Sequence, residues 1–294
     1  MRRIMLLALI ILALGTLAVA CGGGKSDSNS QSKITPIEGN SELVVGPNRF
    51  AMALLDKDNN MISDAGGNAV HLQFFEPDGA LQSEADAHFV WAIQDVTGFW
   101  ATNVTFDKAG AWNAQATLSS SGKDTTIKVG FDVSERGFAP KIGDPAPPAD
   151  NLTLAQDSNM KRLSTDPQPN ESFYQLTVTQ ALDAHKPFVV TFATPLFCQT
   201  QFCGPILNNV KAVAPEFAAQ ANFIHIEPFE LDENGNLVTD TQGAPIAAQP
   251  TTDWHLQTEP WIFIVGADGK ISSRFEGSAS TDELRAAIQQ ALGG

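Results

Sequence analysis

Positive charge is scarce in this sequence. Its 294 residues include 18 Lys and Arg against 33 Asp and Glu, which gives a formal net charge of −15. Affinity for nucleic acid comes largely from Lys and Arg on phosphates, so this balance argues against a nucleic-acid partner. It also disfavours attraction to an anionic membrane surface. The basic exception is the segment 1–35, which holds four Lys and Arg and one Asp.

The sequence also lacks the composition of a disordered chain. Hydrophobic residues make up 43% and charged residues 17%, which is ordinary for a globular protein. At roughly 150 residues per domain, the length suggests about two domains.

The basic N-terminus reads as an export signal. Arg2 and Arg3 precede an uncharged run over 4–20, followed by small residues, as in a secretory signal peptide. The end of this run, Leu-Ala-Val-Ala-Cys at 17–21, resembles the lipobox of bacterial lipoproteins, although Ala stands where the box usually has Leu. The resemblance implies a signal peptide over 1–21 and a lipid on Cys21. An uncleaved membrane anchor is the alternative, at the short limit for a spanning helix. Both interpretations predict an extracytoplasmic protein held at the bacterial cell membrane.

A flexible linker and a β domain are expected next. Residues 22–35 are rich in Gly, Ser and Asn and cannot bury enough apolar area to fold. In 36–138, apolar and polar residues alternate between clusters of turn residues, with no helical stretch. This pattern predicts an antiparallel β-sandwich. The stretch 98–112 resembles the small immunoglobulin-like domains of bacterial envelope proteins, which implies that fold but no activity.

Beyond a Pro-rich boundary at 139–148 the pattern changes. Capping boxes of the form Thr-x-x-Gln at Thr177 and Ser-x-x-Glu at Ser280 predict two helix starts. Apolar residues at helical spacing over 206–217 predict another helix. Mostly apolar runs predict strands at 188–192, 223–226 and 261–265, and a tight turn at 268–269 predicts a paired strand at 271–275. The resulting order of helix, strand, helix, strand, long loop, β-hairpin and helix predicts an α/β layer fold for 139–294.

This order, with cysteines between the first strand and its helix, resembles thioredoxin. Cys203-Gly-Pro matches the first three residues of the family motif Cys-Gly-Pro-Cys, and Glu259-Pro260 precedes the hairpin, where the family has a cis-proline. Residues 142–147 and 261–271 are similar to the membrane-anchored, extracytoplasmic branch. The resemblance implies thiol–disulfide exchange on envelope proteins, with Glu259 and Pro260 on the substrate side. The fourth motif position is not Cys, and the second thiol lies upstream in a C-x-x-x-x-C spacing.

The chain has three cysteines. If Cys21 carries lipid, Cys198 and Cys203 remain as a pair in an oxidising compartment. Residues five apart on one helix lie ~8 Å apart, beyond the ~4.4–6.8 Å that a disulfide spans between Cα atoms. The helix is therefore expected to begin around Gly204, with Pro205 in its first turn and Cys198 in the preceding loop. Cys203, at the helix mouth, is predicted as the stabilised thiolate and Cys198 as its partner, although these roles could be reversed.

Two alternatives to exchange remain open. The bond between Cys198 and Cys203 could be structural and clamp a loop. Alternatively, two thiolates and the imidazole of His255 could bind copper, as in another branch of the same superfamily. No other cofactor is predicted. Glu259 is expected to place a carboxylate near the pair, where it disfavours a thiolate. The acidic insertion at 229–250 is expected to be a solvated loop.

Overall fold

The structure is a computed structural model that describes residues 34–63, 70–120 and 123–293. The predicted signal segment, its Cys21 and nearly all of the predicted linker lie outside these residues. Within the described part of the chain, no helix is long and apolar enough to cross a membrane.

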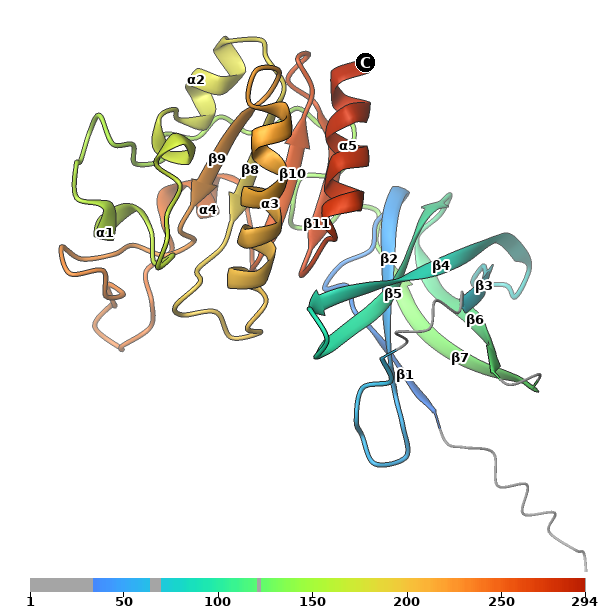
Figure 1. The fold of residues 1–294 in the computed structure, drawn as a ribbon. Coiled ribbons are helices and arrows are strands. Elements are labelled where there is room, and N and C mark those ends of the chain that lie inside the picture. The colour runs from blue at the N-terminus through green and yellow to red at the C-terminus, as the bar shows by residue number, and fades with distance from the viewer. Residues whose placement is uncertain (1–33, 64–69, 121–122, 294) are drawn as a thin grey trace, which may run out of the picture. The chain divides into compact units, whose positions relative to one another are not determined.

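In the N-terminal part, the described residues form seven strands that pair antiparallel with their neighbours and no helix (Figure 1). Hydrogen bonds join seven strands in the order β1-β2-β5-β4-β3-β6-β7. The alternation predicted from the sequence is confirmed, because buried and exposed residues alternate along β3 and through most of β5. The strands are β1 Thr35–Glu38, β2 Gly46–Leu55, β3 Val70–Phe75, β4 Leu81–Ile93, β5 Thr97–Phe106, β6 Gly110–Ser120 and β7 Lys123–Val133.

The long strand β4 belongs to both halves of this sheet. It pairs with β3 through residues 81–87 and with β5 through residues 88–93. The halves share one core, in which the rings of Phe50, Phe74 and Phe131 are in contact. The expected antiparallel β fold is confirmed. The finer expectation of an immunoglobulin-like sandwich stays a prediction, because β4 joins the two halves in one hydrogen-bonded order.

The C-terminal part has the predicted order of helices and strands. Its sheet has the order β11-β10-β8-β9, in which β8 and β9 are parallel and the other neighbours antiparallel. The sequence analysis did not predict the short helices α1 and α4 or a 3-10 turn at Glu171–Tyr174. The elements are α1 Met160–Leu163, α2 Val178–Asp183, β8 Phe188–Phe192, α3 Cys203–Phe217, β9 Asn222–Ile226, α4 Gln249–Asp253, β10 Trp261–Val265, β11 Ile271–Glu276 and α5 Thr281–Gly293.

Helices cover this sheet on both faces. Apolar residues of α3 and α5 pack with Ile262 and Ile264 of β10 on one face. On the other face, Val178 of α2 and Trp254 after α4 pack with Phe263 of β10. All residues of β8 and β10 are buried, as their continuous apolar runs predicted. Both predicted capping boxes are present at the starts of α2 and α5.

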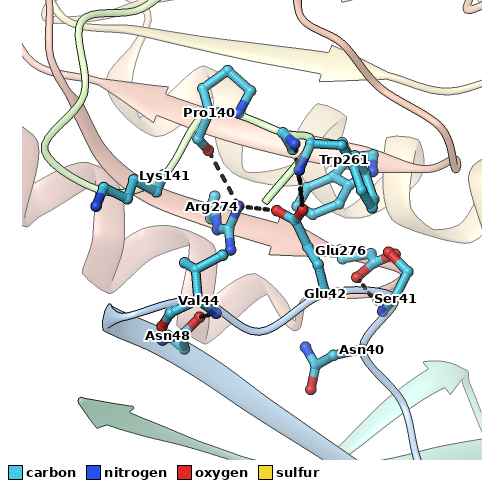
Figure 2. Close-up of polar contacts among 12 residues, drawn as sticks. Asn40, Ser41, Glu42, Val44, Asn48, Pro140, Lys141, Trp261, Arg274 and Glu276 are labelled. Atoms are coloured by element: carbon cyan, nitrogen blue, oxygen red, sulfur yellow. Dashed lines mark hydrogen bonds and ion pairs between the residues drawn. The ribbon is translucent and has the colours of Figure 1, made fainter. Parts of the chain in front are cut away.

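A buried ion pair connects the chain before β2 to β11 (Figure 2). Glu42 accepts from the guanidinium of Arg274 at 2.6 Å, and both side chains are 7% exposed. The other carboxylate oxygen accepts from the backbone N–H of Phe138 at 2.6 Å. The guanidinium also donates to the Pro140 carbonyl at 3.3 Å and lies 5.6 Å from the ring centre of Trp261. Each charge is thus compensated by several partners, as a buried charge requires.

Replacing Arg274 by Met leaves the carboxylate of Glu42 buried without its counter-charge. We expect Arg274→Met to lower the free energy of unfolding by about 3–5 kcal/mol. Arg285→Met is the matched control, because Arg285 pairs with Glu216 at the surface, where a salt bridge contributes about 1 kcal/mol or less. Urea unfolding of both variants measures the difference. Equal losses of unfolding free energy in the two variants would show that the buried pair of Glu42 and Arg274 stabilises the fold no more than a surface pair does.

Candidate redox site

The two cysteines lie on either side of the start of α3. Strand β8 ends at Phe192, residues 193–202 form a loop that contains Cys198, and α3 begins at Cys203. The cysteines are joined by a disulfide with their Cα atoms 5.9 Å apart. The predicted break in helical geometry between them is confirmed, and the helix begins one residue earlier than expected.

The environments of the two sulfurs differ, and the difference favours the second of the two role assignments that the sequence left open. Cys203 is 0% exposed, whereas Cys198 is half-buried. The backbone N–H of Cys203, in the first turn of α3, donates to the sulfur of Cys198 at 3.2 Å. The Thr200 hydroxyl lies 3.3 Å from the same sulfur. The free N–H groups of a helix start stabilise a thiolate, so the geometry favours Cys198, not Cys203, as the stabilised and accessible thiolate.

Glu259 and Pro260 lie just before β10. The peptide bond between them is cis, and the carbonyl of Pro260 accepts from the N–H of Gly277 at 3.0 Å. The carboxylate of Glu259 faces the cysteine loop, because the backbone N–H of Gln199 donates to it. Burial raises the pKa of Glu259, and the Gln199 N–H opposes this rise. A carboxyl group therefore lies beside the residue that follows Cys198.

His255, the third residue of the copper alternative, is exposed. It borders a cavity lined by residues of the segment 136–147, and neither cysteine lines that cavity. Within the described ranges, no three His, Cys, Asp or Glu side chains are grouped so as to hold a metal ion. The structure therefore offers no support for a copper site formed by Cys198, Cys203 and His255, and that alternative stays a prediction for the reduced protein.

The sequence analysis did not single out Glu227, whose buried carboxyl lies against the cysteine loop. Glu227 follows β9 directly and is 5% exposed. Its Oε1 accepts from the backbone N–H of Thr165 at 2.5 Å and from the Thr165 hydroxyl at 2.6 Å. Burial raises the pKa of Glu227 to about 7, and the hydrogen bonds from Thr165 oppose the rise. The sequence signal for this group is an acidic residue directly after a largely apolar strand.

A buried histidine anchors the first residue of the loop. His225 of β9 is 1% exposed, and its Nε2 donates to the carbonyl of Ala193 at 2.9 Å. Since a carbonyl only accepts, Nδ1 is left to accept from the hydroxyl of Tyr174, at 2.7 Å. Burial lowers the pKa of His225 to about 4, so the ring is neutral at pH 7. The neutral ring holds the end of β8 in place.

Comparisons with known proteins give little beyond this geometry. No family model matches the chain, and no curated protein matches it. Among solved structures, a thioredoxin-family thiol:disulfide interchange protein from Chlorobium tepidum TLS is 15% identical with a TM-score of 0.34, over 53% of this chain and all of its own. The trypsin-activated alpha-2-macroglobulin of Escherichia coli is 16% identical with a TM-score of 0.25, over 42% of this chain and 8% of its own. At these TM-scores neither likeness bears on the function, which has to be inferred from the site itself.

The difference in burial predicts that the two thiols of the reduced protein react at different rates. We expect iodoacetamide to alkylate Cys198, measured in the Cys203→Ser variant, at least tenfold faster than Cys203, measured in Cys198→Ser. The reason is that Cys198 is accessible and receives a backbone N–H, whereas Cys203 is covered. Mass spectrometry of timed samples gives both rates. Faster alkylation of Cys203 would restore the roles predicted from the sequence.

Glu227 predicts a pH dependence of stability. Its pKa is higher in the folded chain than in the unfolded chain, so the unfolded chain loses this proton first as pH rises. The contribution of Glu227 to the free energy of unfolding is therefore fully present below about pH 4.5, and it is lost as the pH rises to about 7. Relative to wild type, Glu227→Gln should gain up to about 3 kcal/mol of unfolding free energy across that window. Urea unfolding at several pH values measures the gain, and a constant difference between the two proteins would contradict the assignment.

Proposed function

We propose that the chain is a thioredoxin-like protein that exchanges disulfides with thiols of envelope proteins through Cys198 and Cys203. The observation that carries this proposal is the asymmetry of the pair. One sulfur is accessible and receives the N–H at a helix start, and the other is buried next to it. A bond with only a structural role needs no such arrangement, whereas exchange requires one thiol that attacks and a second that resolves.

The chemistry balances in either direction. When the pair is reduced, the Cys198 thiolate attacks one sulfur of a substrate disulfide, forms a mixed disulfide and releases the other substrate sulfur as a thiolate. Cys203 then loses its proton and attacks the sulfur of Cys198, which releases the second substrate thiolate. Two electrons pass to the substrate, and the Cys198–Cys203 bond forms. The reverse sequence oxidises a substrate dithiol and leaves the pair reduced.

We further propose that Glu259 and Pro260 lie on the substrate side of the pair. The support is the hydrogen bond from the Gln199 N–H to the carboxylate of Glu259, which brings that carboxylate to the residue that directly follows Cys198. A negative charge there disfavours a free thiolate. Glu259 would thereby favour the disulfide form of the pair and make the reduced pair a stronger reductant.

Reduction of insulin by dithiothreitol tests the exchange activity. We expect the wild-type protein to accelerate the reaction and a Cys198→Ser, Cys203→Ser double variant to leave it at the uncatalysed rate. The reduced Cys203→Ser variant should accumulate a mixed disulfide with insulin, because it lacks the resolving thiol. Cys198→Ser should accumulate far less. A wild-type rate equal to that of the double variant would reject the exchange function and leave a structural disulfide.

We propose that the described part of the chain is tethered outside the cytoplasm by a lipid on Cys21. The support is the sequence alone: a basic start, an uncharged run and the Leu-Ala-Val-Ala-Cys segment at 17–21. In this proposal, residues 22–35 are a linker, residues 36–138 an immunoglobulin-like spacer or docking domain, and residues 139–294 the exchange domain.

Mass spectrometry of the mature N-terminus tests the anchor. We expect the chain, expressed in a bacterium that processes lipoproteins, to begin at Cys21 and to carry acyl groups there. Cys21→Ser should abolish both the lipid and the membrane association. An intact Met1, or cleavage with an unmodified Cys21, would defeat the proposal.

A further inference from the structure

The loop that carries Cys198 is tied to a distant segment of the chain through the backbone of Leu196. Leu196, two residues before Cys198, is 67% exposed, so its side chain contributes little packing. Its backbone N–H donates to the hydroxyl oxygen of Thr165 at 3.2 Å. This contact ties the loop to a segment that lies 31 residues earlier in the chain. The position of Leu196 therefore depends on how firmly Thr165 is held.

Thr165 is in turn held by a single carboxylate oxygen. Its hydroxyl has one proton, and the 2.6 Å contact with Oε1 of Glu227 uses it. The lone pairs of the hydroxyl oxygen are then free to accept from Leu196. The backbone N–H of Thr165 donates to the same Oε1 at 2.5 Å. The three groups form a directed chain of hydrogen bonds that ends on Glu227, and such chains strengthen when the final acceptor is ionised.

The second oxygen of Glu227 faces the cysteine loop. Oε2 is buried, and the buried hydroxyl of Thr194 in that loop lies beside it. This hydroxyl carries its own proton, so it favours the ionised carboxylate and lowers the pKa of Glu227. Ionised Glu227 thus faces donors on both Thr165 and Thr194.

The other charged groups around Glu227 are mostly acids, and the cations among them are paired. Asp166 is bound to Lys211 of α3 at 2.5 Å, and this acid raises the pKa of Glu227 further. The neutral ring of His225 is occupied by Ala193 and Tyr174.

Glu227 also borders a cavity of about 590 Å³, whose charged lining residues are Asp150, Arg162, Glu230, Asp232 and Glu233. Arg162 is paired with Asp157 at 2.8 Å, so among the described residues this lining supplies no unpaired cation to hold Glu227 ionised.

We propose that Glu227 is a positioning residue for Cys198. Glu227 acts through Thr165 and Leu196, and it makes the reactivity of Cys198 depend on the protonation of this buried carboxyl. The proposal rests on the exchange function proposed above. Glu227 does not contact the sulfurs. Its protonation state changes the position in which the loop holds Cys198, and this change is expected over a pH range centred near neutrality.

Amide hydrogen exchange of the oxidised full chain tests the anchor without any need for exchange activity. Thr165→Val keeps the shape but removes the hydroxyl, and Thr165→Ser keeps the hydroxyl. We expect the protection factor of the Leu196 amide to fall about tenfold in Thr165→Val and to stay within about twofold in Thr165→Ser, since losing a hydrogen bond costs about 1.4 kcal/mol. The Ala193 amide, which donates to Ile226, is the internal control for intact folding. Unchanged protection of Leu196 in Thr165→Val would overturn the proposal.

Alkylation of reduced Cys198 across pH 5.5–8.5 tests the coupling. We expect the wild-type profile to show a second inflection near pH 7 that is absent in Glu227→Gln and in Thr165→Val but present in Thr165→Ser. A merely structural role would shift all rates by one factor and leave the inflection in place. An inflection that persists in Glu227→Gln would overturn the coupling. Because neither measurement uses a protein substrate, a failed insulin assay with these results intact would reject the exchange function alone.

Discussion

Two cysteines five residues apart can bridge only where the chain is not helical between them, and this constraint organises the site. The disulfide requires Cα atoms closer than a helix would place them. The chain meets this requirement by starting α3 at Cys203 and leaving Cys198 in the loop, with 5.9 Å between the two Cα atoms. One consequence is that the first helical N–H points at the sulfur of Cys198. Another is that the loop needs anchors of its own, which His225 of β9 and Glu227 directly after β9 supply.

The regular elements of the C-terminal part could be read from the sequence because local signals specify them. The run 188–192 is apolar apart from Thr191, and it forms β8 with the same bounds. Thr177 and Gln180 form a capping box whose two hydrogen bonds are both present. The helices α1 and α4 carried no such signal, because four or five residues are too few to show a helical period. In the N-terminal part, alternation predicted strands but not their pairing, since the use of β4 by both halves depends on contacts distant in sequence.

The roles within the site could not be read in the same way. The spacing of Cys198 and Cys203 predicted a break in the helix, but the burial of Cys203 comes from packing that the spacing does not encode. Glu227 is marked by its partner: Thr165 donates twice to its carboxylate and lies 62 residues earlier in the chain. No local pattern in the sequence indicates this contact. Burial and pairing of polar groups are properties of the assembled core, so sequence patterns miss them where they matter for chemistry.

The reduction potential of the Cys198–Cys203 pair tests the central claim most directly. Equilibration of the full chain with glutathione buffers of known ratio, read by mass spectrometry after alkylation, gives this value. A pair that exchanges disulfides should have a potential between about −270 and −120 mV. A potential below about −300 mV would mark the bond as structural and contradict the account.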